Sequence, residues 1–419
     1  MVRRIVTIGQ GYVGLPLSVA AVEAGFHVVG YDVDAQKVIR IRDGDSPVED
    51  IPNGRLAEAL ASGRYLPTAD PTDLHGFDVA VISVPTPLRD GIPDLSFIEQ
   101  AATLLAGHLR TGCCVILEST TYPGTTEELV QPILEVGSGL TAGRDFHLAY
   151  SPERIDPGNP TWRFENTPKV VAGLTPACLD AVQAFYGELV GTTIPVTTLR
   201  TAELTKLLEN TFRHVNIALV NELAMFAHAL DIDVWEAIDA AATKPFGFMR
   251  FTPGPGVGGH CLPIDPSYLS WRVKRSLGHT FRFVELANDI NEHMPDYVAR
   301  RLLEAFNARG LALRGKRVLL LGLSYKRNTG DTREAPSRAI AQRLHALGAV
   351  VVAADPHVTL ADVPAGLELV DASEEEAAGA DAVVVLVDHD AFDLKRLASA
   401  APYVLDTRRV VEGDNVEQL

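Results

Sequence analysis

Apolar runs and helical patterns alternate along the first half of the chain. The apolar runs have the length of buried strands, and they recur at 5–8, 27–34, 78–85, 113–120 and 169–173. A helical pattern over 11–25 separates the first two runs. Because strands that alternate with helices form parallel sheets with crossover helices, this part of the sequence predicts an α/β domain.

The pattern changes after residue 200 and later returns. Residues 203–230 carry apolar side chains at helical spacing without Gly or Pro, which predicts one long helix. Further helices are expected at 233–242, 281–309 and 337–348, and further strands at 315–325, 349–356, 381–389 and 403–410. We therefore predict an α/β fold of two Rossmann-like domains joined by a central helical domain. The predicted boundaries are 1–199, 200–309 and 310–419.

Composition and charge narrow the class of partner. The formal net charge of −17 disfavours nucleic acid, whose binding depends on Lys and Arg contacts to phosphate. No apolar run approaches the ~18 residues that a membrane span needs, and the first strand begins too early for a signal peptide. We expect a cytoplasmic protein with no membrane partner. Its cysteines, Cys113, Cys114, Cys178 and Cys261, form no CxxC pair, which favours reduced thiols.

The turn after the first predicted strand has the sequence GQGYVG. Gly9 would allow a tight turn, Gly11 the approach of a pyrophosphate, and Gly14 close packing of the next helix. The N-terminus of that helix would present N–H groups to the phosphates. Asp32 ends the second strand, about 20 residues further on, where a carboxylate bonds ribose hydroxyls. The pattern favours NAD over NADP, and a purely structural turn is the alternative.

The stretch GPGVGGHCLPIDP surrounds a single thiol, Cys261, for which three interpretations compete. The thiol could be inert packing. It could ligate a metal with His260 and Asp265, but adjacent side chains diverge and no second Cys or His lies at ligand spacing. It could add to an aldehyde as a nucleophile, giving a thiohemiacetal and then a thioester. Gly256 and Gly258 favour close approach of backbone and ligand over a packed core.

Candidate partners for a reactive thiol lie elsewhere in the chain. Lys206 and Asn210 are four residues apart on the predicted long helix, so they share a face and would suit an oxyanion. Glu153 in SPER and Thr120 in STTYPGTT follow predicted strands, where loops of an α/β sheet face ligands. A carboxylate and a hydroxyl could hold a hydrolytic water. By spacing alone, an exposed helix face and solvated loop residues remain the alternatives.

Together these motifs resemble the UDP-glucose/GDP-mannose dehydrogenase family. The similarity runs essentially end to end, through GQGYVGLP, SVPTP, STTYPGTT, SPER, ELTKLLEN, GPGVGGHCLPIDP, GLSYKRNTGDTRE and LDTRR. The resemblance implies an NAD-dependent enzyme of polysaccharide biosynthesis that oxidises C6 of a UDP-sugar from alcohol to carboxylate in two steps. It also implies a homodimer that forms through the central helices, and binding of the UDP portion by the C-terminal domain.

The resemblance further implies roles for individual residues. Cys261 would be the nucleophile, Lys206 and Asn210 would face the oxyanion, and Asp265 would support the lysine. Thr120 and Glu153 would serve the hydrolytic water. The cofactor positions that match are Gly9, Gly11, Tyr12, Val13, Gly14, Asp32, Lys37, Thr86, Thr120 and Arg333. The substrate positions that match are Glu153, Arg154, Lys206, Asn210, Arg250, Phe251, Gly256, Gly258, Lys326 and Arg408.

The segment KPFGFMRFTPGPGVGGHCLPIDPSYLSWR bears on the sugar. It looks most like bacterial UDP-N-acetylglucosamine 6-dehydrogenases, so we expect a UDP-N-acetylhexosamine as substrate, with UDP-glucose as the alternative. Arg250 departs from the family, in which proline is frequent at this position. A dehydrogenase that transfers a single hydride and a non-catalytic nucleotide-sugar sensor are the less favoured hypotheses.

Overall fold

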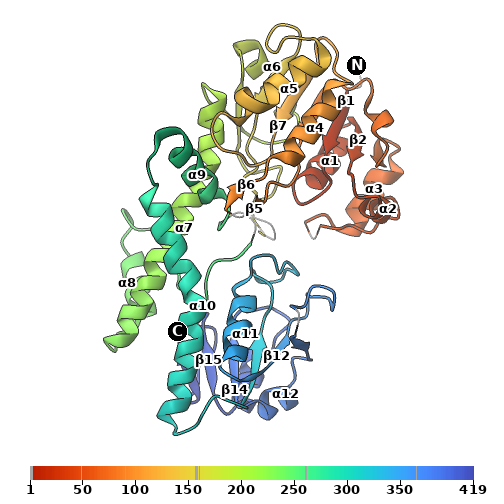
Figure 1. Ribbon diagram of the computed structural model, residues 1–419. Helices are drawn as coiled ribbons and strands as arrows, with labels where there is room; N and C mark the ends of the chain where they lie inside the picture. Colours follow the sequence, from red (N-terminus) through yellow and green to blue (C-terminus); the bar gives the residue numbers. More distant parts are fainter. Residues whose placement is uncertain are drawn as a thin grey trace. The chain divides into compact units, whose positions relative to one another are not determined.

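The structure is a computed structural model that describes residues 3–48, 50–89, 91–155, 159, 161–259, 262–364 and 366–419. The chain divides into two compact units. The first comprises Met1–Glu209 and Trp271–Gly278, and the second comprises Asn210–Ser270 and His279–Leu419. Each unit contains a mainly parallel sheet between two layers of helices (Figure 1). This arrangement confirms the predicted α/β fold, whereas the three predicted domain boundaries stay a prediction.

The first unit is built on an eight-stranded sheet in the order β10-β9-β8-β7-β4-β1-β2-β3. Its strands are β1 (Arg4–Ile8), β2 (His27–Tyr31), β3 (Tyr65–Thr68), β4 (Val79–Ile82), β7 (Cys114–Leu117), β8 (His147–Tyr150), β9 (Lys169–Gly173) and β10 (Thr193–Pro195). Alternate residues of β4 enter opposite cores, with Val81 in one and Ala80 in the other. Helices therefore cover both faces, as a buried parallel sheet requires.

The helices of the first unit follow their strands as crossover connections. They are α1 (Gly14–Glu23), α2 (Ala35–Arg42), α3 (Asn53–Ala61), α4 (Ser96–Ala106), α5 (Gln131–Ser138) and α6 (Pro176–Tyr186). Shorter elements are η1 (Pro71–Leu74), η2 (Thr126–Val130) and a hairpin of β5 (Leu88–Arg89) and β6 (Ile92–Pro93).

One edge of this sheet differs from the predicted parallel arrangement. β9 runs antiparallel to β8, with Tyr150 opposite Ala172 and Ala149 opposite Gly173. The reason lies in the connection, because residues 151–168 contain no helix in the part that the structure describes. A strand that pairs in parallel with the strand before it needs a crossover connection, usually a helix. A strand that pairs antiparallel begins near the carboxyl end of the strand before it. The first residue of β9, Lys169, therefore lies at the edge where β7 and β8 end.

The second unit repeats the strand order of the first in a six-stranded sheet, β13-β12-β11-β14-β15-β16. Its strands are β11 (Arg317–Leu321), β12 (Val350–Ala354), β13 (Glu368–Leu369), β14 (Ala382–Val385), β15 (Val404–Asp406) and β16 (Val416–Gln418). Its crossover helices are α11 (Pro336–Ala346), α12 (Glu374–Gly379) and α13 (Leu394–Ala400). All of these strands pair in parallel.

Four further helices make up the middle of the chain. They are α7 (Leu199–Ala229), α8 (Val234–Ala242), α9 (Asp265–Leu277) and α10 (Arg282–Ala308). The predicted long helix at 203–230 is confirmed as α7, and α9 was not predicted. The unit boundary falls within α7, so Lys206 belongs to the first unit and Asn210 to the second. None of the helices in the described parts of the chain combines the length and apolarity needed to cross a membrane.

The turn after the first strand is built alike in both units. Gly9 and Gly322 both have a left-handed backbone, with φ of +94° and +95°. Each donates its N–H to the carbonyl oxygen of the last residue of the next strand along the chain. The distance is 2.8 Å from Gly9 N to Tyr31 O on β2, and 2.9 Å from Gly322 N to Ala354 O on β12. A side chain would clash in either place, because a Cβ on Gly9 or Gly322 would come within 2.5 Å of its nearest neighbour. Only glycine fits both requirements.

Candidate active site

The GQGYVG turn carries three glycines, of which the packing of the protein requires two. Gly9 makes the left-handed turn. A Cβ on Gly14 would lie 1.8 Å from the carbonyl oxygen of Gly9, so this glycine lets α1 pack against the turn. A Cβ on Gly11 would meet no heavy atom within 4 Å in the described chain. Packing therefore explains Gly9 and Gly14, whereas Gly11 borders open space where a ligand could approach the backbone.

The N-terminus of α1 suits a phosphate. Val13 is its N-cap residue, and in this described stretch no side chain caps the helix and no acidic residue lies in its first turn. By contrast, Asp34 caps α2 and Thr175 caps α6. Tyr12 is partly buried against the core beside α1. An uncapped helix end leaves N–H groups and a positive dipole end for an anion.

Asp32 lies at the end of β2 and ties three segments together. Its carboxylate accepts hydrogen bonds from Gln10 N at 2.9 Å and Asp34 N at 3.0 Å, and it forms an ion pair with Lys37 Nζ at 2.8 Å. It is 6% exposed. Thr86 is buried in the loop that follows β4, the strand at the topological switch point. Their contact with the diphosphate and ribose of a dinucleotide stays a prediction.

The corresponding acid of the second unit, Asp355, also bonds the turn after the first strand of its sheet. The Asp355 carboxylate accepts from Leu323 N at 2.7 Å and Ser324 N at 3.0 Å, and His389 Nε2 lies 3.1 Å from it. Burial opposes ionisation of Asp355, but these donors outweigh it and lower its pKa to about 2. The carboxylate is thus fully engaged within the protein.

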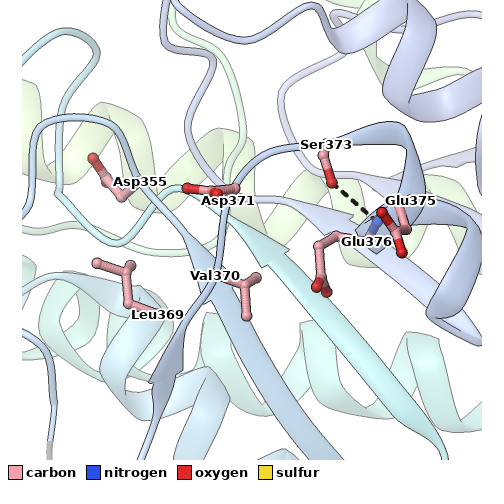
Figure 2. Close-up of a pocket in the computed structure, with 7 residues that line it drawn as sticks. All are labelled: Asp355, Leu369, Val370, Asp371, Ser373, Glu375 and Glu376. Atoms are coloured by element: carbon pink, nitrogen blue, oxygen red, sulfur yellow. Dashed lines mark hydrogen bonds between the residues drawn. The ribbon is translucent and has the colours of Figure 1, made fainter.

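A pocket of about 570 Å³ opens beside Asp355 at the ends of β12 and β13 (Figure 2). Four of its lining residues are acidic, and the full lining is Asp355, Leu369, Val370, Asp371, Ser373, Glu375 and Glu376. Carboxylates around this pocket would repel a diphosphate there, and the predicted UDP contacts, Lys326 and Arg408, are not among its lining residues. The dinucleotide geometry is therefore a property of the first unit.

Lys206 contacts another of the predicted site residues, Thr120, a pairing that the sequence did not predict. Its Nζ donates to Thr120 Oγ1 at 2.6 Å, and Lys206 is only 8% exposed. One turn earlier on α7, the buried Glu203 accepts from Gly124 N at 2.5 Å and from Thr126 N at 2.9 Å. Glu203 thereby fastens the STTYPGTT loop to α7. Burial raises the pKa of Glu203 to about 7.

Glu153 is buried and surrounded by donors. Its Oε1 accepts from Arg154 N at 2.6 Å and Ile155 N at 2.7 Å, and its Oε2 accepts from Lys169 Nζ at 2.7 Å. Burial opposes ionisation, but Lys169, the backbone donor and the charge of Lys206 together lower the pKa of Glu153. The structure therefore holds Glu153 as a carboxylate, the form that a general base needs.

Arg154 is engaged by the protein. Its guanidinium forms two hydrogen bonds with Glu209, at 2.6 and 3.1 Å, and a third with Pro168 O at 2.8 Å. These contacts join the SPER loop to α7 and to the residue before β9. Its predicted contact with substrate stays a prediction.

In the second unit, Asn210 donates to Asp265 Oδ2 at 2.6 Å. Asp265 is the first residue of α9 and is 1% exposed, so a buried carboxylate fixes the orientation of the Asn210 amide. The predicted nucleophile, Cys261, lies outside the described residues, as does His260.

The glycines before Cys261 have a role that the sequence did not reveal. A Cβ on Gly258 would lie 2.7 Å from the Cβ of Tyr325 and 2.8 Å from Glu334 O. Gly259 donates its N–H to Arg333 O at 3.1 Å, and a Cβ on Gly256 would lie 3.2 Å from Pro336. The segment thus packs against the GLSYKRNTGDTRE loop. Within the second unit, these glycines admit another stretch of backbone.

The remaining predicted residues of the second unit lie around this packing. Arg250 is exposed and its Nε donates to Asp239 at 2.8 Å, while Phe251 packs on the α7–α8 core. Arg333 forms an ion pair with Asp331. Arg408 lies 3.5 Å from Asp388, and a Cβ on Gly254 would lie 3.3 Å from its guanidinium. The carbonyl oxygen of Lys326 accepts from Ser324 and Thr329 hydroxyls, which fixes the loop backbone there.

Three family models match the chain in order. They are the NAD binding domain, the central domain and the UDP binding domain of the UDP-glucose/GDP-mannose dehydrogenase family, over residues 3–190, 200–293 and 319–413. The chain belongs to the UDP-glucose/GDP-mannose dehydrogenase family. It is an NAD-dependent nucleotide-sugar dehydrogenase, and its cofactor is NAD.

Individual members of the family are similar over nearly their whole length. The chain is 37% identical to a UDP-N-acetyl-D-mannosamine dehydrogenase of Pyrococcus horikoshii, covering 93% of this chain and 90% of the relative. It is 35% identical to a UDP-N-acetyl-D-glucosamine 6-dehydrogenase of Salmonella typhi, again covering 93% and 90%. A solved structure of the UDP-D-ManNAc dehydrogenase of Pyrococcus horikoshii superposes with a TM-score of 0.90 at 34% identity, covering 99% and 98%.

Sequence reasoning missed several buried polar residues of this dehydrogenase. Glu118 and Lys169 pair beside Glu153, and Gln10 accepts from the hydroxyls of Tyr65 and Ser18 beneath the glycine turn. Lys169 had a signal in the sequence. A charged residue at the end of an otherwise apolar strand, such as Lys169 before VVAG, must find a partner when the strand is buried.

Gly11 and Gly14 offer a matched test of the cofactor site. We expect Gly11→Val to leave the melting temperature unchanged but to weaken NAD binding at least about tenfold, or ~1.4 kcal/mol, because its side chain enters open space that the cofactor needs. We expect Gly14→Ala to destabilise the protein by roughly 1–3 kcal/mol, because its Cβ overlaps a backbone oxygen. Calorimetric NAD titration and thermal unfolding measure both. Equal NAD affinity for Gly11→Val and the wild type would contradict this placement.

Proposed function

We propose that this dehydrogenase oxidises the C6 hydroxymethyl group of a UDP-N-acetylhexosamine to a carboxylate, with UDP-N-acetylglucosamine as the preferred substrate. The observation that carries the proposal is the contact of Lys206 with Thr120 near the buried Glu153, whose pKa is lowered. An ammonium, a hydroxyl and a carboxylate base are what hydrolysis of an acyl intermediate requires. An enzyme that transferred a single hydride would have no acyl intermediate to hydrolyse.

The proposed reaction has two oxidations and one hydrolysis. The alcohol first loses a hydride from C6 and the proton of its hydroxyl group, which passes to solvent, and becomes an aldehyde. The Cys261 thiolate then adds to the aldehyde carbon, and loss of hydride from the thiohemiacetal leaves a thioester. When bound, NAD supplies the acceptor for each hydride. Water finally attacks the thioester carbon, the C–S bond breaks, and the carboxylate leaves with regeneration of the thiol.

The described residues have complementary parts in this scheme. We infer that Lys206 and Asn210 donate to the oxygen of C6 as it becomes negative. Asp265 orients Asn210 through their 2.6 Å hydrogen bond. Thr120, which already accepts from Lys206, and Glu153 hold the water, and Glu153 takes its proton. A general base of this kind contributes on the order of 10²–10⁴ to rate.

The remaining predicted residues serve binding in this proposal. Gly9, Gly11, Gly14 and Asp32 hold the cofactor in the first unit. Lys326 and Arg408 bind the UDP portion in the second unit, which contains the match to the family's UDP binding domain. We also propose that the domains divide at 1–199, 200–309 and 310–419, and that the enzyme works in the cytoplasm, where its thiols stay reduced.

The choice of sugar is supported by the relatives. One similar enzyme is named for UDP-N-acetyl-D-mannosamine and another for UDP-N-acetyl-D-glucosamine, so both sugars carry the 2-acetamido group. UDP-glucose, which lacks that group, is the second candidate. A pocket built to hydrogen-bond an amide would discriminate strongly against a sugar that leaves those groups unpaired.

A panel of nucleotide sugars tests the substrate. We expect the highest kcat/KM for UDP-N-acetylglucosamine, a lower value for UDP-N-acetylmannosamine, and a value for UDP-glucose lower by about 1.4 kcal/mol or more, which is tenfold. Initial NADH formation at matched concentrations gives the ranking. A higher kcat/KM for UDP-glucose than for every acetamido sugar would contradict the proposed substrate.

We also propose that the enzyme is a homodimer that forms through α7. Large apolar side chains follow one another at spacings of three, four or seven residues along this helix and are 41–63% exposed: Leu204, Leu208, Phe212, Leu219, Leu223 and Phe226. A stripe of this length on a monomer indicates an interface. A second copy of the same helix would cover it by two-fold symmetry.

Substitution within this stripe should break the dimer. We expect Leu219→Glu with Leu223→Glu to convert the protein to a monomer at micromolar concentration, because burying two carboxylates in an apolar contact is costly. Sedimentation velocity measures the change. The control is Val136→Glu on α5, which alters an isolated apolar residue that is 86% exposed and should leave a dimer. A wild type that sediments as a monomer would exclude this interface.

A further inference from the structure

Three charged side chains from neighbouring strands meet behind the proposed hydrolytic site. Glu118 follows β7, Glu153 follows β8, and Lys169 begins β9. The antiparallel direction of β9 brings Lys169 to this edge, because the β8–β9 register that pairs Tyr150 with Ala172 runs on toward Glu153 and Lys169. Lys169 Nζ donates to both carboxylates, to Glu153 at 2.7 Å and also to Glu118.

All three groups are withdrawn from solvent. Glu118 is 1% exposed, Lys169 4% and Glu153 7%. The Lys169 ammonium also lies 5.5 Å from the ring centre of Phe164 and 5.2 Å from that of Tyr186, in cation–π geometry. The ammonium is thus held from several sides, and its pKa is raised because the two carboxylates outweigh the effect of burial.

The charges of the cluster do not balance when all three groups are ionised. Two carboxylates then share one buried ammonium, and the further positive charge nearby, Lys206, favours ionisation of Glu153. Glu153 accepts three hydrogen bonds and lies in the field of Lys206, so it retains its charge. Glu118 has fewer donors, and its Oε2 has no hydrogen-bond partner among the described residues. Burial raises the pKa of Glu118 to about 7, so the proton resides there near neutrality.

We propose that Glu118 and Lys169 are positioning residues for hydrolysis of the acyl intermediate. Lys169 holds Glu153 as a carboxylate. When Glu118 ionises, it shares the ammonium with Glu153, and the weaker hold on Glu153 makes that residue a stronger base. The inference rests on the proposed function, since it assigns a partner to the base of that reaction.

Two further titratable groups near the cluster, a phenol and a thiol, stay neutral near neutrality. Burial raises the pKa of the Tyr186 phenol on α6 well above its ordinary value, so it stays neutral. Burial likewise raises the pKa of the Cys114 thiol on β7. The positive charge of Lys206, on α7, contributes to the lowered pKa of Glu153. Glu118 is therefore the group of this cluster whose ionisation follows pH between 6 and 8.

Glu118→Gln tests the proposal with little change of shape. Glutamine keeps an oxygen that accepts from Lys169 but does not ionise. We expect the first two hydride transfers to keep their rate, while hydrolysis becomes roughly tenfold slower at pH 8, a part of the 10²–10⁴ that a general base supplies. Hydrolysis in the wild type should rise with pH through about 7, whereas in Glu118→Gln it should stay flat. Stopped-flow NADH bursts and intact-protein mass of the acyl-enzyme measure the two phases.

A second variant removes the charges of Glu118 and Lys169 together. It therefore leaves neither of these two groups as a buried charge without its partner. In Glu118→Gln with Lys169→Met, Glu153 loses its ammonium partner and takes up a proton. We expect a retained burst, hydrolysis slower by about 10² or more, and an acyl-enzyme that accumulates. The matched control is Glu417→Gln, which breaks the ion pair of a buried arginine, Arg301, in the second unit. It should lower stability and leave the ratio of the two phases unchanged.

Glu153→Gln distinguishes a failure of the proposed function from a failure of the role proposed for Glu118 and Lys169. In one outcome, Glu153→Gln accumulates acyl-enzyme, but Glu118→Gln slows the NADH burst and hydrolysis in the same proportion and keeps the wild-type pH profile. The cluster would then be structural, and the inference would be overturned while the proposed function stands. If Glu153→Gln accumulates no acyl-enzyme, the proposed function fails and the inference fails with it.

Discussion

A carboxylate at the end of the second strand, bonded to the backbone of the turn after the first, organises each unit of this protein. Asp32 holds Gln10 N, and Asp355 holds Leu323 N and Ser324 N. The bond fixes the turn at the topological switch point, where the loops of an α/β sheet meet a ligand. What surrounds the carboxylate then decides its use. In the first unit, Gly11 borders open space and no side chain caps the helix that follows the turn. In the second unit, the imidazole of His389 lies in hydrogen-bond contact with the Asp355 carboxylate.

The reversed direction of β9, the second strand from one edge of the sheet, has a chemical consequence. If β9 were parallel to β8, its first residue would lie near the amino ends of β7 and β8, on the side of the sheet away from Glu118 and Glu153. The antiparallel direction instead places an ammonium between Glu118 and Glu153, at the edge that carries Thr120 and the end of the SPER strand. A buried base can stay ionised only with such compensation. The same strand that departs from the predicted topology therefore supplies the electrostatics of the proposed site.

The sequence predicted the features that depend on periodicity and on turn chemistry. Strand and helix ranges followed from apolar spacing, and the roles of Gly9 and Gly14 followed from the strand–turn–helix context. The direction of β9 was not predicted, because the apolar pattern of a short strand does not show whether it pairs parallel or antiparallel with its neighbour. The glycines near Cys261 showed that backbone must come close, but Gly258 proved to meet Tyr325 and Glu334. Which partner approaches is set by tertiary packing, which local sequence does not encode.

The central claim of the account is covalent catalysis by Cys261, and its most direct test is substitution of that thiol. Cys261→Ser should form no sugar carboxylate and no acyl-enzyme under conditions in which the wild type forms both, because a serine hydroxyl is a much weaker nucleophile at neutral pH. Cys178→Ser, which alters a buried thiol on α6, should still form the acid. Product analysis by mass spectrometry after incubation with UDP-N-acetylglucosamine and NAD decides the matter. Acid formation by Cys261→Ser at a rate near that of the wild type would contradict the account.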